Sequence, residues 1–382
     1  MAEQNTLFLY LFIWFLMVFL VSFIPNKLFA STKSSKLNIS NSILYWGGAL
    51  APICVYAIFW GLREDVGTDY YSYVLFFNEA EARLDFSTEY AFIYLCMFLK
   101  HIGFDAISLF VVTSFISVFT IFMVARNFNK RFLTSLICFY ILISCLYSLN
   151  GVRSAMAYSI FMVALSFFCK DKNNRAPFIL IFLLSFFIHH TTILLFMLVL
   201  FLKFLRRIEI NLLFLVVIYI LCELLGIKMQ NFFFVATQGL TVLLGYGDQI
   251  SYIEIAKEGD LGFMVLLRIM LSFITFYAYN KYYNKSGKKD FIYYSFFIFI
   301  VGLFLSRIFV GSLLLMRVAK VFSYLGFIIV AFSFSSLVSS RSLRDRLLGY
   351  FLLIGHVVTF SIHILGNSNG VTPYFWHTSV FG

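Results

Sequence analysis

Four segments of the sequence set charged or titratable residues against long apolar runs. These segments, "GLREDVGTDYYSY", "LNGVRSAMAYS", "FFIHHTTILL" and "LLLMRVAKVFSYLGF", contain Arg63 and Asp69, Arg153, His189, and Arg317. An arginine can hold two phosphate oxygens at once without a metal ion, and histidine is suited to proton transfer near neutral pH. Together these groups fit a chemistry that binds a dianionic headgroup, such as a lipid diphosphate, and moves a proton.

The elements that position these residues are predicted to be membrane helices. The chain has 382 residues, is 62% hydrophobic and contains 51 Phe and 23 Tyr, more apolar surface than one soluble core can bury. Its apolar runs approach the length of a bilayer crossing, so we expect an all-α polytopic integral membrane protein with a single transmembrane domain over 1–382. The first run follows Glu3 rather than a basic segment, which favours a retained helix over a cleaved signal peptide.

The net charge of +11 lies mainly in short segments between the apolar runs. The basic segments are 25–42, 126–131, 170–175, 203–209, 281–290 and 341–346. Residues 61–89 carry seven acids against two arginines, and residues 228–260 carry four acids against two lysines. The positive-inside rule places the basic segments in the cytoplasm and the acidic ones on the outer face, so the basic charge does not indicate a nucleic-acid partner.

Threading the chain through the membrane under this rule gives about 12 helices, with both termini outside. The predicted spans are 7–24, 43–60, 105–125, 132–149, 152–169, 209–227, 261–280, 290–311, 313–337 and 347–365. Residues 176–204 are predicted to form two short helices that meet near His189 and His190, a re-entrant arrangement. Residues 89–104 are predicted to lie on or partly in the outer surface, and 228–260 to form a long outer loop.

The segment that begins at Gly61 is predicted to be an elbow on the outer face, and 61–104 to comprise this elbow and interfacial helices. Gly67 permits a tight turn, and Tyr70, Tyr73, Val74 and Phe77 follow at the spacing of one helix face. Asp69 precedes that helix, where a carboxylate can cap free N–H groups. A purely structural interpretation stays open, in which Arg63 extends toward the headgroups and the tyrosines anchor the interface.

The motifs "R…VGTDYYSY", "EYAFIYLCMFLKHIGFD", "NGVRSAMAY" and "IHHTTILL" resemble, in this order, those of the Wzy-type O-antigen and exopolysaccharide polymerases. The resemblance covers roughly 60–200, and "MRVAKVFSYLGF" matches less closely. The chain differs at Ser154, where the family often has Gln, and at Thr191, where Ser is usual. The resemblance implies a metal-independent membrane glycosyltransferase of the bacterial inner membrane. It would transfer the growing glycan from undecaprenyl diphosphate to a new lipid-linked repeat unit on the periplasmic face.

The resemblance also suggests roles for individual residues. His189 and Asp69 are the catalytic candidates. The substrate-binding candidates are Arg63, Gly67, Tyr70, Tyr73, Arg153 and Arg317. We expect His189 to handle the proton and Asp69 to pair with Arg63 and position it, while the tyrosines either stack on sugars or anchor the interface.

No cofactor is expected, because the sequence has no P-loop and its six cysteines lack the spacing of metal ligands. Undecaprenyl-diphosphate-linked oligosaccharides and membrane lipids are the implied partners, and the resemblance allows for a chain-length regulator protein. A lipid-linked oligosaccharide flippase or other transporter, and an O-antigen ligase, remain as alternatives. A transporter should place its polar residues near the bilayer midplane, whereas here they gather at one face.

Overall fold

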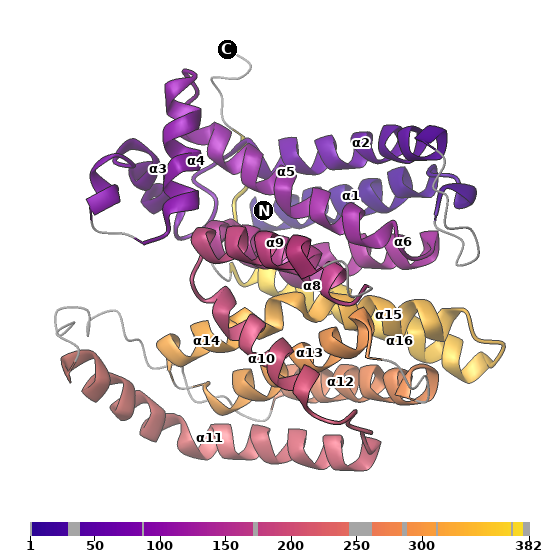
Figure 1. Ribbon diagram of the computed structural model, residues 1–382. Helices are drawn as coiled ribbons and strands as arrows, with labels where there is room; N and C mark the ends of the chain where they lie inside the picture. The colour runs from indigo at the N-terminus through magenta and orange to yellow at the C-terminus, as the bar shows by residue number, and fades with distance from the viewer. Residues whose placement is uncertain are drawn as a thin grey trace. The chain divides into compact units, whose positions relative to one another are not determined.

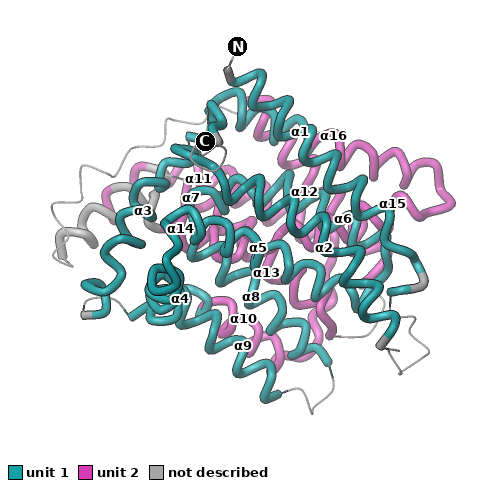
Figure 2. Tube along the Cα trace, turned by 90° about the horizontal axis from the view of Figure 1, so that it is seen from above, with its two compact units in different colours: residues 1–193, 356–382 teal, residues 194–355 magenta. Residues whose placement is uncertain are grey.

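The computed structural model describes residues 2–29, 39–85, 88–170, 175–243, 262–284, 289–310, 312–367 and 370–376. The chain divides into two compact units, coloured separately in Figure 2. Unit 1 comprises residues 1–193 and 356–382, and unit 2 comprises residues 194–355. The boundaries between the units fall inside two helices, α10 (Thr192–Phe204) and α16 (Leu343–Leu365).

Unit 1 contains most of the predicted site. Its helices, all but α7 labelled in Figure 1, are α1 (Ala2–Ser22), α2 (Ile39–Gly61), α3 (Tyr70–Asn78), α4 (Tyr90–His101), α5 (Ala106–Ala125), α6 (Lys130–Phe139), α7 (Cys145–Asn150), α8 (Val152–Phe168) and α9 (Arg175–Ile188). Short 3-10 turns at Asn26–Leu28 and Ala82–Asp85 and a π-helical segment at Tyr140–Ser144 connect some of them. The strands β1 (Arg63–Glu64) and β2 (Phe375–Trp376) also belong to this unit.

Unit 2 contains helices of 11 to 32 residues. They are α11 (Leu212–Leu243), α12 (Phe263–Tyr282), α13 (Phe291–Ile308), α14 (Leu313–Ser323) and α15 (Phe327–Val338), with a 3-10 turn at Tyr324–Gly326 between the last two. The helix α11 continues to Leu243, so the first part of the predicted outer loop 228–260 is helical. The part of that loop beyond 243 lies outside the described residues.

The predicted fold class is confirmed, since the protein is an all-α, multi-pass membrane protein. Within the described residues, eight helices are long and apolar enough to cross a membrane, and four shorter apolar helices accompany them. The break predicted near His189 is present, because α9 ends at Ile188 and α10 begins at Thr192. The segment predicted not to span forms α4, which has only 12 residues.

Within each unit the basic segments gather at a common end of the helices. In unit 1, Lys130 donates to the Ser22 carbonyl, and Arg126 Nη2 lies 2.9 Å from Ser42 Oγ. In unit 2, Arg207 Nη2 donates to the Asn284 carbonyl at 2.5 Å, and Lys281 Nζ lies 2.7 Å from the Asp345 carboxylate. Neighbouring basic loops therefore meet, as the threading requires, and the assignment of that end to the cytoplasm stays a prediction.

The C-terminal tail fastens the predicted elbow in unit 1. The strand β1 pairs antiparallel with β2, so that Arg63 opposes Trp376, and the Gly67 amide donates to the Gly370 carbonyl at 2.8 Å. The same tail reaches the start of α1, where the Tyr374 amide donates to Thr6 Oγ1 at 3.1 Å. The start of α1 and the described part of the tail therefore lie beside the elbow, as the predicted parity requires, and their place on the outer face stays a prediction.

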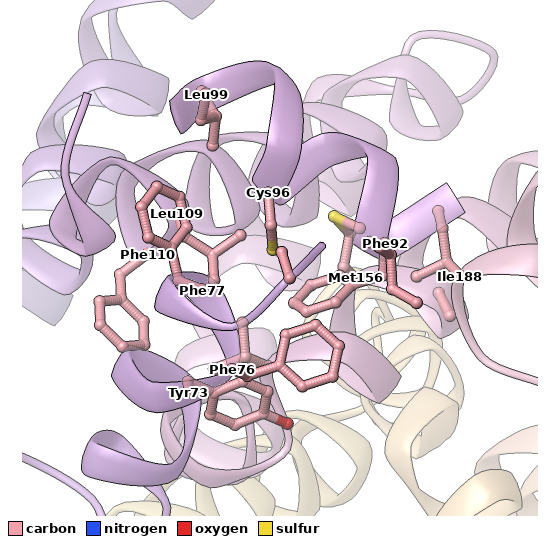
Figure 3. Close-up of a cluster of buried hydrophobic side chains, with 14 of the residues drawn as sticks. Tyr73, Phe76, Phe77, Phe92, Cys96, Leu99, Leu109, Phe110, Met156 and Ile188 are labelled. Carbon is pink, nitrogen blue, oxygen red and sulfur yellow. The ribbon is translucent and has the colours of Figure 1, made fainter. Parts of the chain in front are cut away.

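Figure 3 shows the hydrophobic core that supports the elbow. Tyr73, Phe76 and Phe77 from α3 meet Phe92 and Cys96 from α4, together with residues of α5, α8 and α9. Three residues of the predicted apolar face of α3 are thus buried, Val74 is partly buried, and Phe76 is buried as well. The short helices α3 and α4 are stabilised by this shared core, because nine to twelve residues form only a marginal helix alone.

Candidate functional site

The elbow turn depends on Gly67, as its position predicted. Its φ of +101° lies in the region that side chains other than glycine rarely adopt. A Cβ atom at this position would also lie 2.6 Å from Asn150 Oδ1 and 3.0 Å from the Leu149 carbonyl oxygen. Gly67 therefore lets the elbow backbone pack against the junction between α7 and α8, directly before Arg153.

Arg63 lies inside the protein and bonds to backbone. Its side chain is buried, with the residue only 2% exposed, and it donates to the Trp60 carbonyl at 2.7 Å and the Leu149 carbonyl at 3.0 Å. The guanidinium also stacks on Phe110, 4.5 Å from the ring centroid. Arg63 thus ties the end of α2 to the end of α7, which satisfies carbonyls that helix ends leave without partners.

The expected roles of Asp69 as a helix cap and as the partner of Arg63 are wrong. Asp69 directly precedes α3, but its carboxylate makes no capping hydrogen bond, and among the described contacts Arg63 bonds to backbone carbonyls instead. The ψ of Asp69 is 6°, whereas Asp105, which caps α5, has an extended ψ of −179°. A side chain reaches the amides of the first turn only from such an extended residue. Asp69 is instead exposed.

Tyr70 and Tyr73 are core residues in this structure. The Tyr70 ring stacks on Phe110 with centroids 5.0 Å apart, and Tyr73 packs edge-on against Phe92 at 6.3 Å. The Tyr73 hydroxyl accepts the Arg153 amide at 3.5 Å. Both tyrosines are under 10% exposed, so they link the elbow to α5, α4 and α8 and do not present their rings as an open platform.

The structure brings Arg153 and His189 together through Glu89. One carboxylate oxygen of Glu89 pairs with Arg153 Nη1, and the other lies 2.5 Å from His189 Nδ1. These residues come from the start of α8, the break between α9 and α10, and the residue that precedes α4. Their side chains are 29%, 22% and 12% exposed for Arg153, His189 and Glu89, so the cluster is partly buried but accessible.

The charge of Glu89 is stabilised by both of its partners. Burial alone would raise the pKa of Glu89, but the hydrogen bond from His189 and the positive charge of Arg153 outweigh that effect and lower it. Glu89 is therefore an ionised acceptor near neutral pH. When His189 is neutral, a proton on Nδ1 facing this acceptor leaves Nε2 free to accept a proton from another group.

Aromatic rings of the elbow core hold the other side of Arg153. Its guanidinium carbon lies 5.0 Å from the centroid of Phe76, 5.9 Å from Tyr73 and 5.8 Å from Phe92. A guanidinium within about 6 Å of such rings gains a cation–π attraction. The elbow thus positions Arg153 through its aromatic residues, although Arg63 and Asp69 make no recorded contact with it.

The break after α9 is held by hydroxyl groups. Thr192 Oγ1 donates to the His189 carbonyl at 3.0 Å, and Thr191 Oγ1 lies 2.9 Å from the Tyr158 hydroxyl. The Tyr158 ring in turn packs edge-on against His189 at 6.1 Å. Thr191 therefore keeps a hydroxyl contact that a serine could also make, so this departure from the family motif preserves the local geometry.

His190 and Ser154 have different surroundings from their neighbours. His190 Nδ1 lies 3.4 Å from Thr88 Oγ1, and its ring packs against Phe186 at 4.7 Å. Ser154 Oγ donates to the Gly151 carbonyl and contacts the Tyr147 hydroxyl, both at 2.9 Å. Ser154 thus stabilises the junction before α8. His189 has the hydrogen bond to Glu89, whereas His190 has an electrostatic interaction with it.

Arg317, the remaining predicted residue, lies in unit 2. It is exposed on the N-terminal half of α14, three residues before Lys320. Its predicted role in substrate binding stays a prediction.

Comparison with known proteins gives one match. The model of the EpsG family matches residues 49–376, which is most of the chain. The chain belongs to the EpsG family. No curated protein and no solved structure matches the chain.

EpsG is an exopolysaccharide polymerase-like family, so membership places the protein in polysaccharide biosynthesis and agrees with the class that the motifs indicate. The match extends from the interior of α2 to β2. It therefore includes every predicted site residue, the Glu89 cluster and the tail that pairs with the elbow.

Glu89 is the residue of this EpsG-family site that sequence reasoning missed. It had been counted only among the acids of segment 61–89, although it opens the motif "EYAFIYLCMFLKHIGFD". Its place at the start of a motif without any other acid before Asp105 was the available signal. The described residues contain no group of three or more histidines, cysteines or acids that could hold a metal ion.

Proposed function

We propose that this protein is a polysaccharide polymerase. It would transfer the growing glycan from undecaprenyl diphosphate to the free end of a new lipid-linked repeat unit, on the outer face of the bacterial inner membrane. The observation that carries the proposal is the partly accessible Glu89–Arg153–His189 cluster in a membrane protein of the EpsG family.

His189 supplies the proton acceptor in this proposal. The acceptor sugar hydroxyl gives its proton to His189 Nε2 while its oxygen bonds to the anomeric carbon of the donor glycan. The bond from that carbon to the diphosphate oxygen breaks, and the diphosphate leaves with the electron pair. Glu89 orients the imidazole through Nδ1 and stabilises the imidazolium that forms, the role that a carboxylate has in a Ser–His–Asp triad.

Arg153 supplies positive charge for the leaving diphosphate. A guanidinium has five N–H donors, and the recorded contact with Glu89 uses Nη1. Arg153 is also the second residue of α8, whose N-terminus carries partial positive charge and favours a nearby anion. An arginine at a helix start thus supports binding of a phosphate without a metal ion.

The elbow residues are proposed to position the reacting groups. The burial of Arg63, Tyr70 and Tyr73 favours a positioning role for them over direct contact with substrate. Asp69 is exposed on the elbow and remains a second candidate for the base. Its test is Asp69→Asn, which keeps the shape of the side chain and removes its charge.

Deletion of the gene followed by profiling of the cell-surface glycan tests the function. A polymerase deletion should remove long polymer while molecules that carry a single repeat unit remain. Loss of the single-repeat form as well would instead support a flippase or a ligase. Re-expression of the wild-type chain should restore polymer, and an equally abundant His189→Ala chain should not.

Labelling of introduced cysteines tests the proposed orientation. Ser72 lies on the elbow helix and Ser342 lies within the basic segment 341–346, and both are exposed. A membrane-impermeant thiol reagent should label Ser72→Cys in intact spheroplasts, and Ser342→Cys only after the membrane is opened. The reverse pattern would place the site in the cytoplasm and contradict the proposal.

A further inference from the structure

A second charged cluster lies among the membrane helices of unit 2. It contains three cations, Arg268 from α12, Arg307 from α13 and Lys320 from α14. Glu223 from α11 contributes a carboxylate. Electrostatic interactions join Arg268 to both Arg307 and Glu223, and Lys320 to Arg307. Four helices thus bring three cations and one carboxylate together.

Glu223 is already engaged by Arg307. Glu223 Oε1 lies 3.7 Å from Arg307 Nη1 and accepts the Tyr219 hydroxyl at 3.0 Å. A Cβ atom at Gly226 would lie 1.9 Å from the Arg307 carbonyl oxygen, so this glycine permits α11 and α13 to approach closely. The geometry therefore fixes one cation to the carboxylate and leaves the cluster with an excess of positive charge.

Arg268 and Lys320 supply this excess. No hydrogen bond or ion pair is recorded for either side chain within the described residues, and Arg268 Nε is buried without a partner. A charged side chain without a partner inside a membrane segment is costly, and such residues are rarely kept without a functional reason. Both cations lie in the neighbourhood of Arg307, so their combined positive charge carries a cost that a bound anion would offset.

The cluster lies far from the basic ends of its helices. Glu223 is 11 residues beyond Leu212, Arg268 is 14 before Tyr282, Arg307 is 16 beyond Phe291 and Lys320 is 18 before Val338. At 1.5 Å per residue these offsets correspond to about 17–27 Å, in a hydrocarbon layer about 30 Å thick. The threading therefore places the four side chains in the outer half of the membrane.

We infer that this cluster binds the phosphate or diphosphate headgroup of a membrane lipid. Guanidinium groups bind phosphate oxygens in pairs and the lysine adds a point charge, so Arg268 and Lys320 together match a dianion. The surrounding apolar helices suit the lipid chain. That the headgroup belongs to one of the two lipid-linked substrates rests on the function proposed above, whereas binding of the headgroup does not.

The test measures binding of radiolabelled farnesyl diphosphate to the full-length protein in phosphatidylcholine nanodiscs. We expect Arg268→Gln with Lys320→Gln to weaken this binding by at least about tenfold, because charged hydrogen bonds to the phosphates are lost. Within the described residues, neither side chain has a recorded hydrogen bond or ion pair that its replacement would break, and Glu223 keeps its contacts with Arg307 and Tyr219. The matched control is Arg344→Gln, an exposed arginine of unit 2 near the basic end of α16, which should bind like the wild type.

Competition experiments distinguish recognition of a lipid-linked diphosphate from recognition of free pyrophosphate. Unlabelled farnesyl diphosphate should displace the probe, farnesol should not, and inorganic pyrophosphate should compete only at higher concentration if the lipid chain contributes. Absence of binding by the wild type, or unchanged affinity in a double variant with a normal melting temperature, would overturn the inference. Displacement by pyrophosphate as effective as by farnesyl diphosphate would overturn its lipid part.

The outcomes also distinguish this inference from the proposed function. If deletion of the gene leaves polymer intact while the double variant still loses the probe, the function fails and the site stands. If polymerase activity is established and the double variant binds normally, the site fails and the function stands. Loss of binding in Arg153→Ala but not in the double variant would place the headgroup at the Glu89 cluster and contradict the inference.

Discussion

Arg63 and Arg153 look alike in the sequence but occupy opposite environments. Each sits where a loop meets an apolar helix, and both were predicted to bind a diphosphate. Arg63 is 2% exposed and donates to two backbone carbonyls, whereas the Arg153 side chain is 29% exposed and pairs with a carboxylate beside a histidine. The same residue type thus fastens the scaffold at one position and remains accessible for ligands at the other.

The contrast teaches that partners separate a structural arginine from a functional one. Arg63 donates to two backbone carbonyls, which are fixed parts of the fold and would lose their partner if Arg63 were replaced. Glu89, the partner of Arg153, is a side-chain carboxylate that also contacts His189, so an anionic substrate can compete with it for Arg153. Substitutions at the two arginines should therefore fail in different ways, one by loss of folded protein and the other by loss of polymer.

Arg153→Ala should have the largest effect on activity. Loss of the guanidinium removes positive charge from the leaving diphosphate, so long polymer should disappear while the amount of protein in the membrane stays near normal. Arg153→Lys should restore only part of the polymer, because lysine keeps the charge but loses the paired geometry. Gel analysis of polymer, normalised to protein by immunoblot, measures both. Full-length polymer from Arg153→Lys would show that charge alone suffices.

His189→Ala should lower the rate of polymerisation by about 10²–10⁴-fold, the usual contribution of a general base. The assay uses purified protein and lipid-linked repeat unit, and His190→Ala is the matched control. His190 contacts Thr88 and Phe186 in the described structure, so its replacement should have a much milder effect.

Added imidazole sharpens the test of His189. It should restore part of the rate to His189→Ala if the missing group is a proton acceptor, but it would not repair a structural defect. A near-normal rate in His189→Ala, together with no turnover in Asp69→Asn, would instead make the elbow carboxylate the base.

Arg63→Ala should act on stability. The substitution removes two hydrogen bonds from a charged donor and leaves a cavity beside Phe110, so the unfolding free energy should fall by at least about 2 kcal/mol. A lower melting temperature in detergent, with polymer reduced only in proportion to folded protein, is the expected result. Loss of turnover per folded molecule with an unchanged melting temperature would return Arg63 to the substrate site.

The helices and their breaks could be predicted from the sequence because they depend on local patterns. Apolar runs defined the spans, and two polar histidines in one long run marked the end of α9. The tight turn at Gly67 could be predicted from a glycine that precedes an amphipathic helix in a charged segment, and the structure forms it with a positive φ. Charge asymmetry correctly placed the basic loops of each unit together, since that rule acts on short segments.

The partners of the charged residues could not be predicted because they come from distant parts of the chain. Glu89 lies 64 residues from Arg153 and 100 from His189, and Arg63 bonds to a carbonyl 86 residues away. The pairing of β1 with β2 also joins segments whose short sequences carry no strand signal. The prediction that Asp69 caps α3 was wrong for a different reason. Aspartate is a suitable capping residue, but the ψ angle of Asp69 is not extended.

Glu89→Gln should have the smallest effect of these substitutions, a loss of stability that is complete near neutral pH and disappears in acid. The pKa of Glu89 is lowered in the folded protein, so its ionised form is bound more favourably there than in the unfolded chain. This contribution is complete above the unfolded pKa, about 4.3 for a glutamate, and is lost as the pH falls through the lower folded value. Melting temperatures of the wild type should therefore fall more steeply below about pH 5 than those of Glu89→Gln. The exposed Glu81→Gln substitution is the control and should follow the wild type.

Parallel curves for wild type and Glu89→Gln would show that the carboxylate charge does not stabilise the cluster. Arg153 would then lack the electrostatic partner that distinguishes it from Arg63.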